Sequence, residues 1–426
     1  MNDENLDLKI PNQIAATSTP KKIIYDLDQQ LIESIKRNNF YPKPLHICSG
    51  GTTSQCFSNN KYTFDLRKNF NKIIFSPDRS TIEIGTGTKM WQIIEELYKK
   101  NKVFPIGLSG NVGAGYLLTG GISPIGRNKG LAVDHIEKFR GIWGTGEKFN
   151  IEKPKIESSQ QHKEKWNGLI TIAPFLGIIT NITLRTFQNK SIKIYQSKVS
   201  QDELCESIIK AEKWPENISL QWAWADDIII YIIIEIDKDK NYFDHLIKDL
   251  SFFNPKKFNT LSSFKEAPKF IIPFKNTSTN KIVQSEVLGL LGKDFKEDVK
   301  NIVNNLSNII KYRPHSNCFL ACQQTGGKIN TIKNENYSTT LRNSSWKPWI
   351  NGAWDSNDLY TRGLSLKWMQ ELWDLMEPFC DGIHLAQMHQ HLNWHQKETE
   401  LAFRDLLPEL KTLKSKYDPN GILPSL

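Results

Sequence analysis

The chain has 426 residues, more than one ordinary hydrophobic core accommodates, so two domains are expected. Apolar residues make up 39% and charged residues 24%, which is typical of a globular protein, and no apolar run approaches the roughly 18 residues of a membrane-spanning helix. Residues 1–13 carry acidic residues where an export signal has basic ones. We therefore expect a cytoplasmic protein without a membrane span. The net charge of +9 comes from lysines scattered along the chain without a nucleic-acid-binding signature, which argues against nucleic acid as a partner.

The first part of the chain is typical of short strands that alternate with helices. Residues 1–20 form a polar lead-in that ends at a proline. The apolar spacing then predicts, in chain order, a helix over 26–37, strands over 45–48, 62–66 and 80–85, and a helix over 90–100. The last of these helices is amphipathic, and we expect Trp91 and Tyr98 on its apolar side.

Two glycine-rich segments interrupt this pattern. The first is SGGTTS at 49–54, and the second runs from 107 to 130 with eight glycines among apolar residues. A flexible linker lacks such apolar residues, so these glycines indicate a packed backbone that something approaches closely. Neither segment is a GxGxxG turn between a strand and a helix. Two interpretations stay open: backbone amides that bind a phosphate-type ligand, and purely structural turns.

The rest of the chain divides near residue 189. Polar residues 147–165 predict an exposed loop, regular structure resumes at 168, and alternation over 176–186 predicts a half-buried strand. Beyond residue 189 we predict a second domain with strands at 219–223 and 228–236, helices at 243–250 and 294–310, and C-terminal helices at 364–376 and 398–417.

The ordered series of motifs carries a family resemblance. SGGTTS, TIEIGTGTKMWQIIEEL, GLSGNVGAGYLLTGGISPIGRNKGLAVDHI, LGIITNITLR, QTGGKIN, TLRNSSW and LKSKYDPNGIL follow one another between residues 49 and 423. This series resembles the vanillyl-alcohol oxidase/p-cresol methylhydroxylase (PCMH) superfamily, in its berberine-bridge-enzyme-like branch. The resemblance implies an α+β fold: a PCMH-type FAD-binding domain over 21–188, a substrate domain over 189–395 with a sheet covered by helices, and a segment over 396–426 that returns to the FAD domain.

The resemblance also implies FAD as the cofactor and assigns residues to it. The paired-glycine loop would bind the pyrophosphate, the second glycine segment would line the flavin, and a later strand would pass the adenine half. The implied cofactor-binding residues are Ser49, Gly50, Gly51, Thr52, Thr53, Ser54, Ser109, Gly113, Gly115, Gly120, Gly121, Asp134, Gly177, Ile178 and Thr180.

The sequence departs from the family pattern where many members attach FAD covalently. Those members carry a His directly after the paired glycines and a Cys in the second glycine segment. This chain has Thr52 and Ser109 at the matching positions. We therefore expect FAD without a covalent bond.

The catalytic base is a second departure. Relatives often use a Tyr near the end of the substrate domain, whereas residues 382–396 (GIHLAQMHQHLNWHQ) contain four histidines and no Tyr. A neutral His suits proton removal near neutral pH, so we assign catalysis to His389, His391 and Asn393, together with Arg342. A metal site and a purely structural role for the histidines stay open, as does an ion pair for Arg342; no metal is assigned.

Three functions compete on these grounds. The first is oxidation of an alcohol-type small molecule, a sugar or hydroxy acid, with an electron acceptor that the sequence does not name. The alternatives are an NADPH-dependent flavin reductase of the UDP-N-acetylmuramate reductase kind and a non-catalytic relative. Two further residue types are notable. The C-terminal part of the chain is rich in tryptophan, which suits either a hydrophobic core or the aromatic walls of a substrate site, at positions 346, 349, 354, 368, 373 and 394. The six cysteines are expected to be buried free thiols.

Overall fold

The computed structural model describes residues 22–56, 60–107, 110–236, 247–261, 264–266, 283–331 and 340–426. Its helices are α1 (Gln29–Lys36), α2 (Met90–Lys99), α3 (Gly126–Lys129), α4 (Gln160–Leu176), α5 (Gln201–Ala211), α8 (Val299–Ile310), α9 (Lys328–Thr331), α10 (Leu359–Met376), α11 (His395–Phe403) and α12 (Leu407–Tyr417). No helix in these ranges is both long and apolar enough to cross a membrane.

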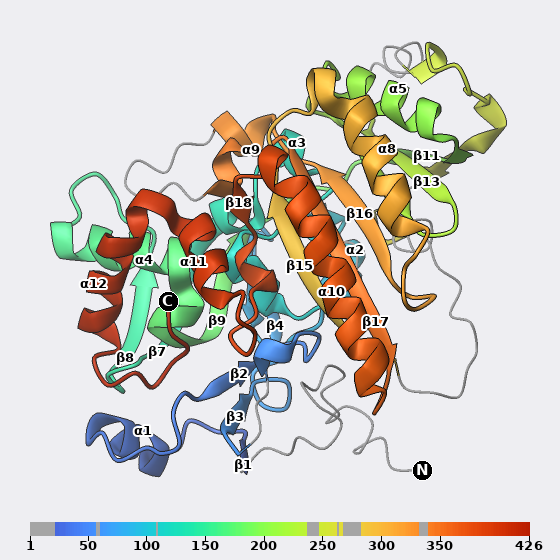
Figure 1. The fold of residues 1–426 in the computed structure, drawn as a ribbon. Helices are drawn as coiled ribbons and strands as arrows, with labels where there is room; N and C mark the ends of the chain where they lie inside the picture. Colours follow the sequence, from blue (N-terminus) through green and yellow to red (C-terminus); the bar gives the residue numbers. More distant parts are fainter. Residues whose placement is uncertain are drawn as a thin grey trace, which may run out of the picture.

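Two small sheets and one large sheet organise the chain, with a further two-stranded pair of β6 and β10 (Figure 1). The first small sheet has the order β1-β3-β2 and is parallel. The second has the order β4-β5-β9-β7-β8 and is antiparallel. Their strands, with the pair, are β1 (Lys22–Ile24), β2 (His46–Cys48), β3 (Tyr62–Asp65), β4 (Ile73–Phe75), β5 (Thr81–Gly85), β6 (Lys102–Val103), β7 (Ile136–Trp143), β8 (Lys148–Glu152), β9 (Gly177–Arg185) and β10 (Phe187–Gln188).

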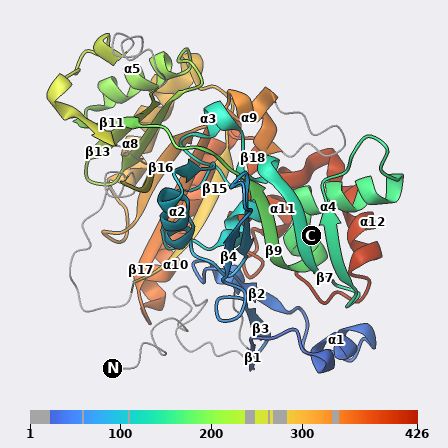
Figure 2. The ribbon, with the colours of Figure 1, turned by 180° about the vertical axis from the view of Figure 1, so that it is seen from behind.

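The large sheet has the order β14-β11-β13-β12-β16-β17-β15-β18. Helices α5, α8 and α10 cover one of its faces, and Figure 2 shows α2 on the opposite side. This arrangement confirms the predicted α+β fold with a helix-covered sheet. The strands are β11 (Ile192–Val199), β12 (Ile218–Trp224), β13 (Ile228–Glu235), β14 (Phe258–Leu261), β15 (Val283–Leu291), β16 (Phe319–Gln324), β17 (Trp346–Asp355) and β18 (Gly382–Ile383).

The C-terminal segment packs against the first part of the chain. Helix α12 contacts α4, and the Tyr417 ring stacks on Trp143 at 4.4 Å between centroids. The amide of Leu45 donates to the carbonyl of Ile422 at 2.7 Å. The predicted domain boundaries remain predictions, but these contacts are those expected of a returning segment.

Three local predictions are wrong. Residues 148–152 form β8, because alternate residues Phe149 and Ile151 are buried, and α4 then begins after the capping hydroxyl of Ser159. Trp91 and Tyr98 are 54% and 45% exposed, since α2 buries a different apolar stripe. The helix over 398–417 is interrupted between α11 and α12. The helix predicted over 243–250 lies mostly outside the described residues.

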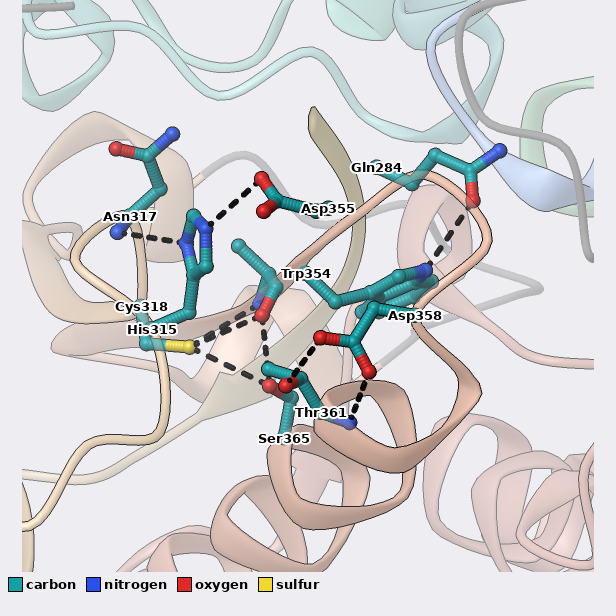
Figure 3. Close-up of polar contacts among 10 residues, drawn as sticks. Gln284, His315, Asn317, Cys318, Trp354, Asp355, Asp358, Thr361 and Ser365 are labelled. Atoms are coloured by element: carbon teal, nitrogen blue, oxygen red, sulfur yellow. Dashed lines mark hydrogen bonds and ion pairs between the residues drawn. The ribbon is translucent and has the colours of Figure 1, made fainter. Parts of the chain in front are cut away.

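The tryptophans and cysteines mainly build the core. Tryptophans 346, 354, 368 and 373 are buried, and all six cysteines are buried free thiols, as predicted. Figure 3 shows one example at the end of β17, where the Cys318 thiol accepts from the amide of Ala353 at 3.1 Å and lies 3.6 Å from the hydroxyl of Ser365. These contacts give Cys318 a structural role that needs no metal.

Candidate active site

The backbone of the paired-glycine loop packs directly against the backbone of the second glycine segment. A Cβ built on Gly50 would lie 2.2 Å from the amide nitrogen of Gly113, and one on Gly113 would lie 2.2 Å from that of Gly50. Ser49 joins the two segments, because its hydroxyl accepts from the amide of Gly115 at 2.8 Å and donates to the carbonyl of Thr86 at 2.5 Å. Only glycine permits this approach, so part of the glycine excess is structural.

Strand β9 joins the same assembly through Thr86. The amide of Thr86 donates to the carbonyl of Thr180 at 2.9 Å, and the Thr180 hydroxyl donates to the carbonyl of Arg140 at 3.2 Å. Gly177 and Ile178 pair with β7 just upstream. The three segments to which the resemblance assigns FAD are therefore adjacent in space.

The loop also keeps donors that fit a pyrophosphate. Within the described part of the chain, the amides of Gly51 and Thr53 donate no hydrogen bond, and Gly51 has a φ of 72°, which glycine adopts readily. Next to the second glycine segment, the buried hydroxyl of Thr88 has no hydrogen-bond partner among the residues that the structure describes. Free amides in a tight loop bind anions well, so these residues fit the phosphate part of FAD.

The twin glycines at the end of the second segment border a pocket. Gly120 and Gly121 have φ of 113° and 71°, a conformation that L side chains rarely adopt. A Cβ on Gly120 would lie 2.6 Å from the Leu341 side chain and 3.9 Å from Nε2 of His384. The pocket is lined by Thr119, Gly120, Leu131, Val133, Ile170, Thr171, Leu291, Leu341, Arg342, Ile383, His384, Leu385 and Ala402.

His384 is the titratable group of this pocket with free nitrogens. Its side chain is buried, the Tyr116 ring lies 5.5 Å away, and neither ring nitrogen makes a well-formed hydrogen bond within the described residues. Burial, followed by the charge of Lys347, lowers the pKa of His384 well below 6.5, although the nearby Thr119 carbonyl and Gln387 side chain favour the protonated ring. The imidazole is therefore neutral and able to accept a proton.

A buried lysine lies close to this histidine. Lys347 is 3% exposed, and its ammonium lies 6.0 Å from the centroid of the Trp349 ring. Burial lowers its pKa from 10.5 to about 7, which the Cys322 sulfur opposes. The buried Oε1 of Gln387 also lacks a partner. The ring nitrogens of His384 and the Oε1 of Gln387 are thus buried without a well-formed partner among the described residues, which is unusual unless a ligand meets them.

Arg342 and Asp134 form a buried ion pair. The guanidinium binds both carboxylate oxygens of Asp134, with one distance of 3.0 Å, and the same carboxylate accepts from the amide of Leu131 at 2.7 Å. Arg342 also lines the pocket. The ion pair is buried rather than at the surface, and it fixes the turn that follows the twin glycines.

His389 and His391 belong to a buried charge network. Nδ1 of His389 lies 2.6 Å from Glu398, and Nε2 of His391 lies 3.0 Å from Glu286. Glu286 also accepts from the hydroxyl of Ser54 at 2.8 Å, so the network joins the paired-glycine loop to β15 and to the C-terminal segment. The hydroxyl of Ser54, which was assigned to the cofactor, thus donates its hydrogen bond to a carboxylate.

This network makes stability depend on pH. Burial alone would lower the pKa of His389, but the hydrogen bond to Glu398 and the charges of Glu398 and Glu286 raise it above 6.5. Burial alone would raise the pKa of Glu286, but the two histidines and Ser54 lower it below 4.5. His389 and Glu286 are both charged between these two pKa values. Their contribution to the free energy of unfolding is lost as pH rises through the raised pKa of His389 and as pH falls through the lowered pKa of Glu286.

We expect the wild type to melt at a higher temperature than His389→Gln at pH 6, and this difference to shrink as pH rises through the raised pKa of His389. Melting curves recorded across this range for both proteins test the expectation. His162→Gln is the control, because His162 of α4 lies 2.7 Å from the carbonyl of Glu152 and is outside the charge network. A difference between wild type and His389→Gln that does not change with pH would contradict it.

The structure thus separates the predicted catalytic residues. His389 and His391 lie in the charge network, Arg342 lies at the pocket, and Asn393 is exposed. Ser109 lies outside the described residues, and Thr52 lies in the paired-glycine loop. The catalytic assignment of these residues remains a prediction.

Two residues of this region were not selected from the sequence: Lys347 was missed, and His384 was counted among the histidines without being assigned a role. In the ranges described, no group of three or more His, Cys, Asp or Glu suits a metal ion.

Gly50→Ala tests the contact between the glycine segments. The added methyl group would collide with backbone atoms of Gly113, so we expect a loss of about 1–3 kcal/mol in the free energy of unfolding and a lower FAD content after purification. Denaturant unfolding and the ratio of flavin to protein absorbance measure the two effects. Gly363→Ala is the control, because a Cβ there meets nothing within 4 Å and α10 favours alanine. Equal effects of both substitutions would contradict the assignment.

Two curated proteins are similar to part of this chain. No protein-family model matches the chain. An FAD-linked oxidoreductase of Arthroderma benhamiae is 32% identical over 123 residues, which is 28% of this chain and 20% of that protein. An FAD-dependent monooxygenase of Aspergillus calidoustus is 28% identical over 131 residues, 30% of this chain and 24% of that protein. The chain therefore spans only about a quarter or less of these curated relatives.

Solved structures match nearly the whole chain. Chitooligosaccharide oxidase has a TM-score of 0.81 at 15% identity and covers 99% of this chain and 95% of its own. BBE-like 1 of Physcomitrella patens has a TM-score of 0.78 at 15% identity, over 97% and 92%. Berberine bridge enzyme of Eschscholzia californica has a TM-score of 0.74 at 16% identity, over 96% and 89%.

Identities this low show a shared fold, and the names of the two curated relatives agree with FAD as the cofactor and with oxidoreduction as the class of reaction. The predicted fold is confirmed by these structures, and the predicted cofactor agrees with the names of the curated relatives. The chain thus shares its fold with chitooligosaccharide oxidase, berberine bridge enzyme and the BBE-like proteins.

Proposed function

We propose that this chain is an FAD-dependent oxidoreductase that oxidises an alcohol-type small molecule, a sugar or a hydroxy acid, with FAD held without a covalent bond. The observation that carries the proposal is the buried His384 ring beside the twin glycines, whose two nitrogens have no well-formed hydrogen bond among the described residues. Such atoms cost free energy unless a bound group pairs with them, and an alcohol hydroxyl can pair with an imidazole nitrogen.

The side chains of the pocket determine which group removes the proton. Bound FAD would supply the hydride acceptor. Neutral His384 is placed to take the hydroxyl proton, because burial keeps it unprotonated near neutral pH. Tyr116, the neighbouring phenol, is an unsuitable base, because burial raises its pKa.

Other residues would bind the phosphate and adenine parts of FAD. The amides of Gly51 and Thr53 would face the pyrophosphate, and the region of Gly177 and Thr180 would pass the adenine half. Thr52 offers a hydroxyl where many relatives carry the tethering His, so retention of FAD depends on this loop. We also propose a cytoplasmic location, supported by six cysteines that are all free thiols.

Anaerobic reduction of the FAD-loaded protein tests the proposal. We expect a panel containing an aldose, a chitooligosaccharide, a hydroxy acid and a benzylic alcohol to include at least one compound that bleaches the visible flavin band, while NADPH leaves it unchanged. Chitooligosaccharide is included because a solved protein of the same fold is named as its oxidase. Rapid bleaching by NADPH without any alcohol would contradict the proposal and favour a reductase.

A further inference from the structure

Two cysteines enclose the paired-glycine loop. Cys48 is the last residue of β2, and Cys56 ends the short turn Ser54–Cys56, so SGGTTS lies between them. Both are free and buried, and they pack against each other in a small cluster of their own. Each backbone is anchored to β3 or its end, because the carbonyl of Cys48 accepts from Leu66 at 2.9 Å and that of Cys56 accepts from Thr63 at 3.1 Å.

Cys56 differs from the other cysteines of the chain. The hydrogen bond with Cys48 lowers its pKa from 9.0 to about 7 against the effect of burial, with help from Thr53 and Arg67. The Thr53 hydroxyl lies 3.7 Å from the sulfur. The thiols with a raised pKa are Cys48, Cys205, Cys318, Cys322 and Cys380. Cys56 is therefore the thiol best prepared to react, with a second thiol in contact.

We propose that Cys48 and Cys56 form a reversible disulfide that closes a covalent ring around the paired-glycine loop when the protein meets hydrogen peroxide. The Cys56 thiolate attacks one peroxide oxygen, the O–O bond breaks, and hydroxide leaves with the proton released by the thiol as water. Cys48 then attacks the sulfenic sulfur of Cys56, the S–O bond breaks, and a second water leaves as the S–S bond forms. Two thiols lose two electrons and peroxide gains them.

The ring would hold the loop in the shape that the structure describes. The two side chains already pack against each other and both backbones are anchored, so the bond would join the two ends of the loop where they now meet. This consequence rests on the proposed function, since the loop then binds the pyrophosphate of FAD. Oxidation would slow the release of FAD in a protein that has no covalent tether to retain it.

Peptide mapping of peroxide-treated protein tests the disulfide without reference to FAD. We expect a Cys48–Cys56 crosslinked peptide that is two hydrogens lighter than its parts, a loss of two free thiols, and reversal by dithiothreitol. Cys205→Ser should keep the crosslink, and Cys56→Ser should lose it. Oxidation of other cysteines first, or of Cys56 without a crosslink to Cys48, would overturn the proposal.

Dilution of FAD-loaded protein into an FAD-free buffer tests the consequence. We expect release of flavin fluorescence to become several-fold slower after peroxide treatment in the wild type and in Cys205→Ser, and to be unaffected by peroxide in Cys48→Ser. Unchanged release from a fully crosslinked wild type would overturn the clamping role. A protein that binds no FAD at all would refute the proposed function, while the peptide map would still decide whether the disulfide forms.

Discussion

His384→Ala is expected to lower the rate of flavin reduction by the alcohol substrate by about 10²–10⁴-fold, the usual contribution of a positioned base. The reason is that His384 is buried at the pocket beside the twin glycines with both ring nitrogens unsatisfied and its pKa well below 6.5. Stopped-flow absorbance of the FAD-loaded variant under anaerobic conditions measures this rate. FAD content is expected to remain that of the wild type, because His384 is remote from the paired-glycine loop in the sequence and makes no well-formed hydrogen bond to it.

His395→Ala is the matched control for this substitution. His395 lies in the same segment and is also partly buried, but it starts α11 and does not line the pocket. We expect a reduction rate within about threefold of the wild type. If His384→Ala retained the wild-type rate while His389→Ala or His391→Ala abolished it, the earlier assignment to those histidines would be correct and ours for His384 would be wrong.

Lys347→Met is expected to make the protein more stable and less active. A fully buried lysine whose pKa falls from 10.5 to about 7 binds its proton more weakly in the folded chain than in the unfolded one. The resulting penalty is full below about pH 7 and disappears as pH rises to 10.5. At about 1.4 kcal/mol for each pH unit, the penalty is at most about 5 kcal/mol, and methionine removes it with a side chain of similar length.

Denaturant unfolding at neutral and alkaline pH tests the stability change. We expect the free energy of unfolding of Lys347→Met to exceed that of the wild type at pH 7 and this advantage to shrink toward pH 10.5. Flavin reduction should slow by roughly tenfold or more, because His384 loses the nearby charge that helps to lower its pKa. Lys367→Met on the exposed side of α10 should change neither quantity. A less stable Lys347→Met variant at neutral pH would show that the ammonium is paired in the folded protein.

The sequence predicts the framework of the fold wherever a periodic pattern meets a buried face. Alternation over 176–186 corresponds to β9, and the apolar run over 228–236 corresponds to β13. The segment 147–165 was too polar to reveal β8 and the start of α4, because an outer hairpin strand needs only two inward residues. Trp91 shows a different limit, since the large ring extends the apolar stripe of α2 in the sequence but lies on its exposed side.

The cofactor region was easier to predict than the catalytic group. Where two backbones must touch, only glycine fits, so such contacts are visible in the sequence as glycines, as at Gly50 and Gly113. The sequence does not show which groups surround a histidine in the folded chain. His389 meets carboxylates from α11 and β15, whereas His384, five residues earlier, faces a pocket made by distant segments. Burial and partners of this kind arise only from the tertiary fold, as does the depressed pKa of Lys347.

The absorption spectrum of the purified, FAD-supplied protein, recorded before and after acid precipitation, tests the central claim most directly. The account predicts a two-banded yellow flavin spectrum whose colour moves entirely to the supernatant, because Thr52 replaces the tethering His. Colour that stays with the precipitate would reveal a covalent bond and contradict the role given to the loop. Protein that remains colourless with excess FAD would contradict the claim that these glycine segments bind the cofactor.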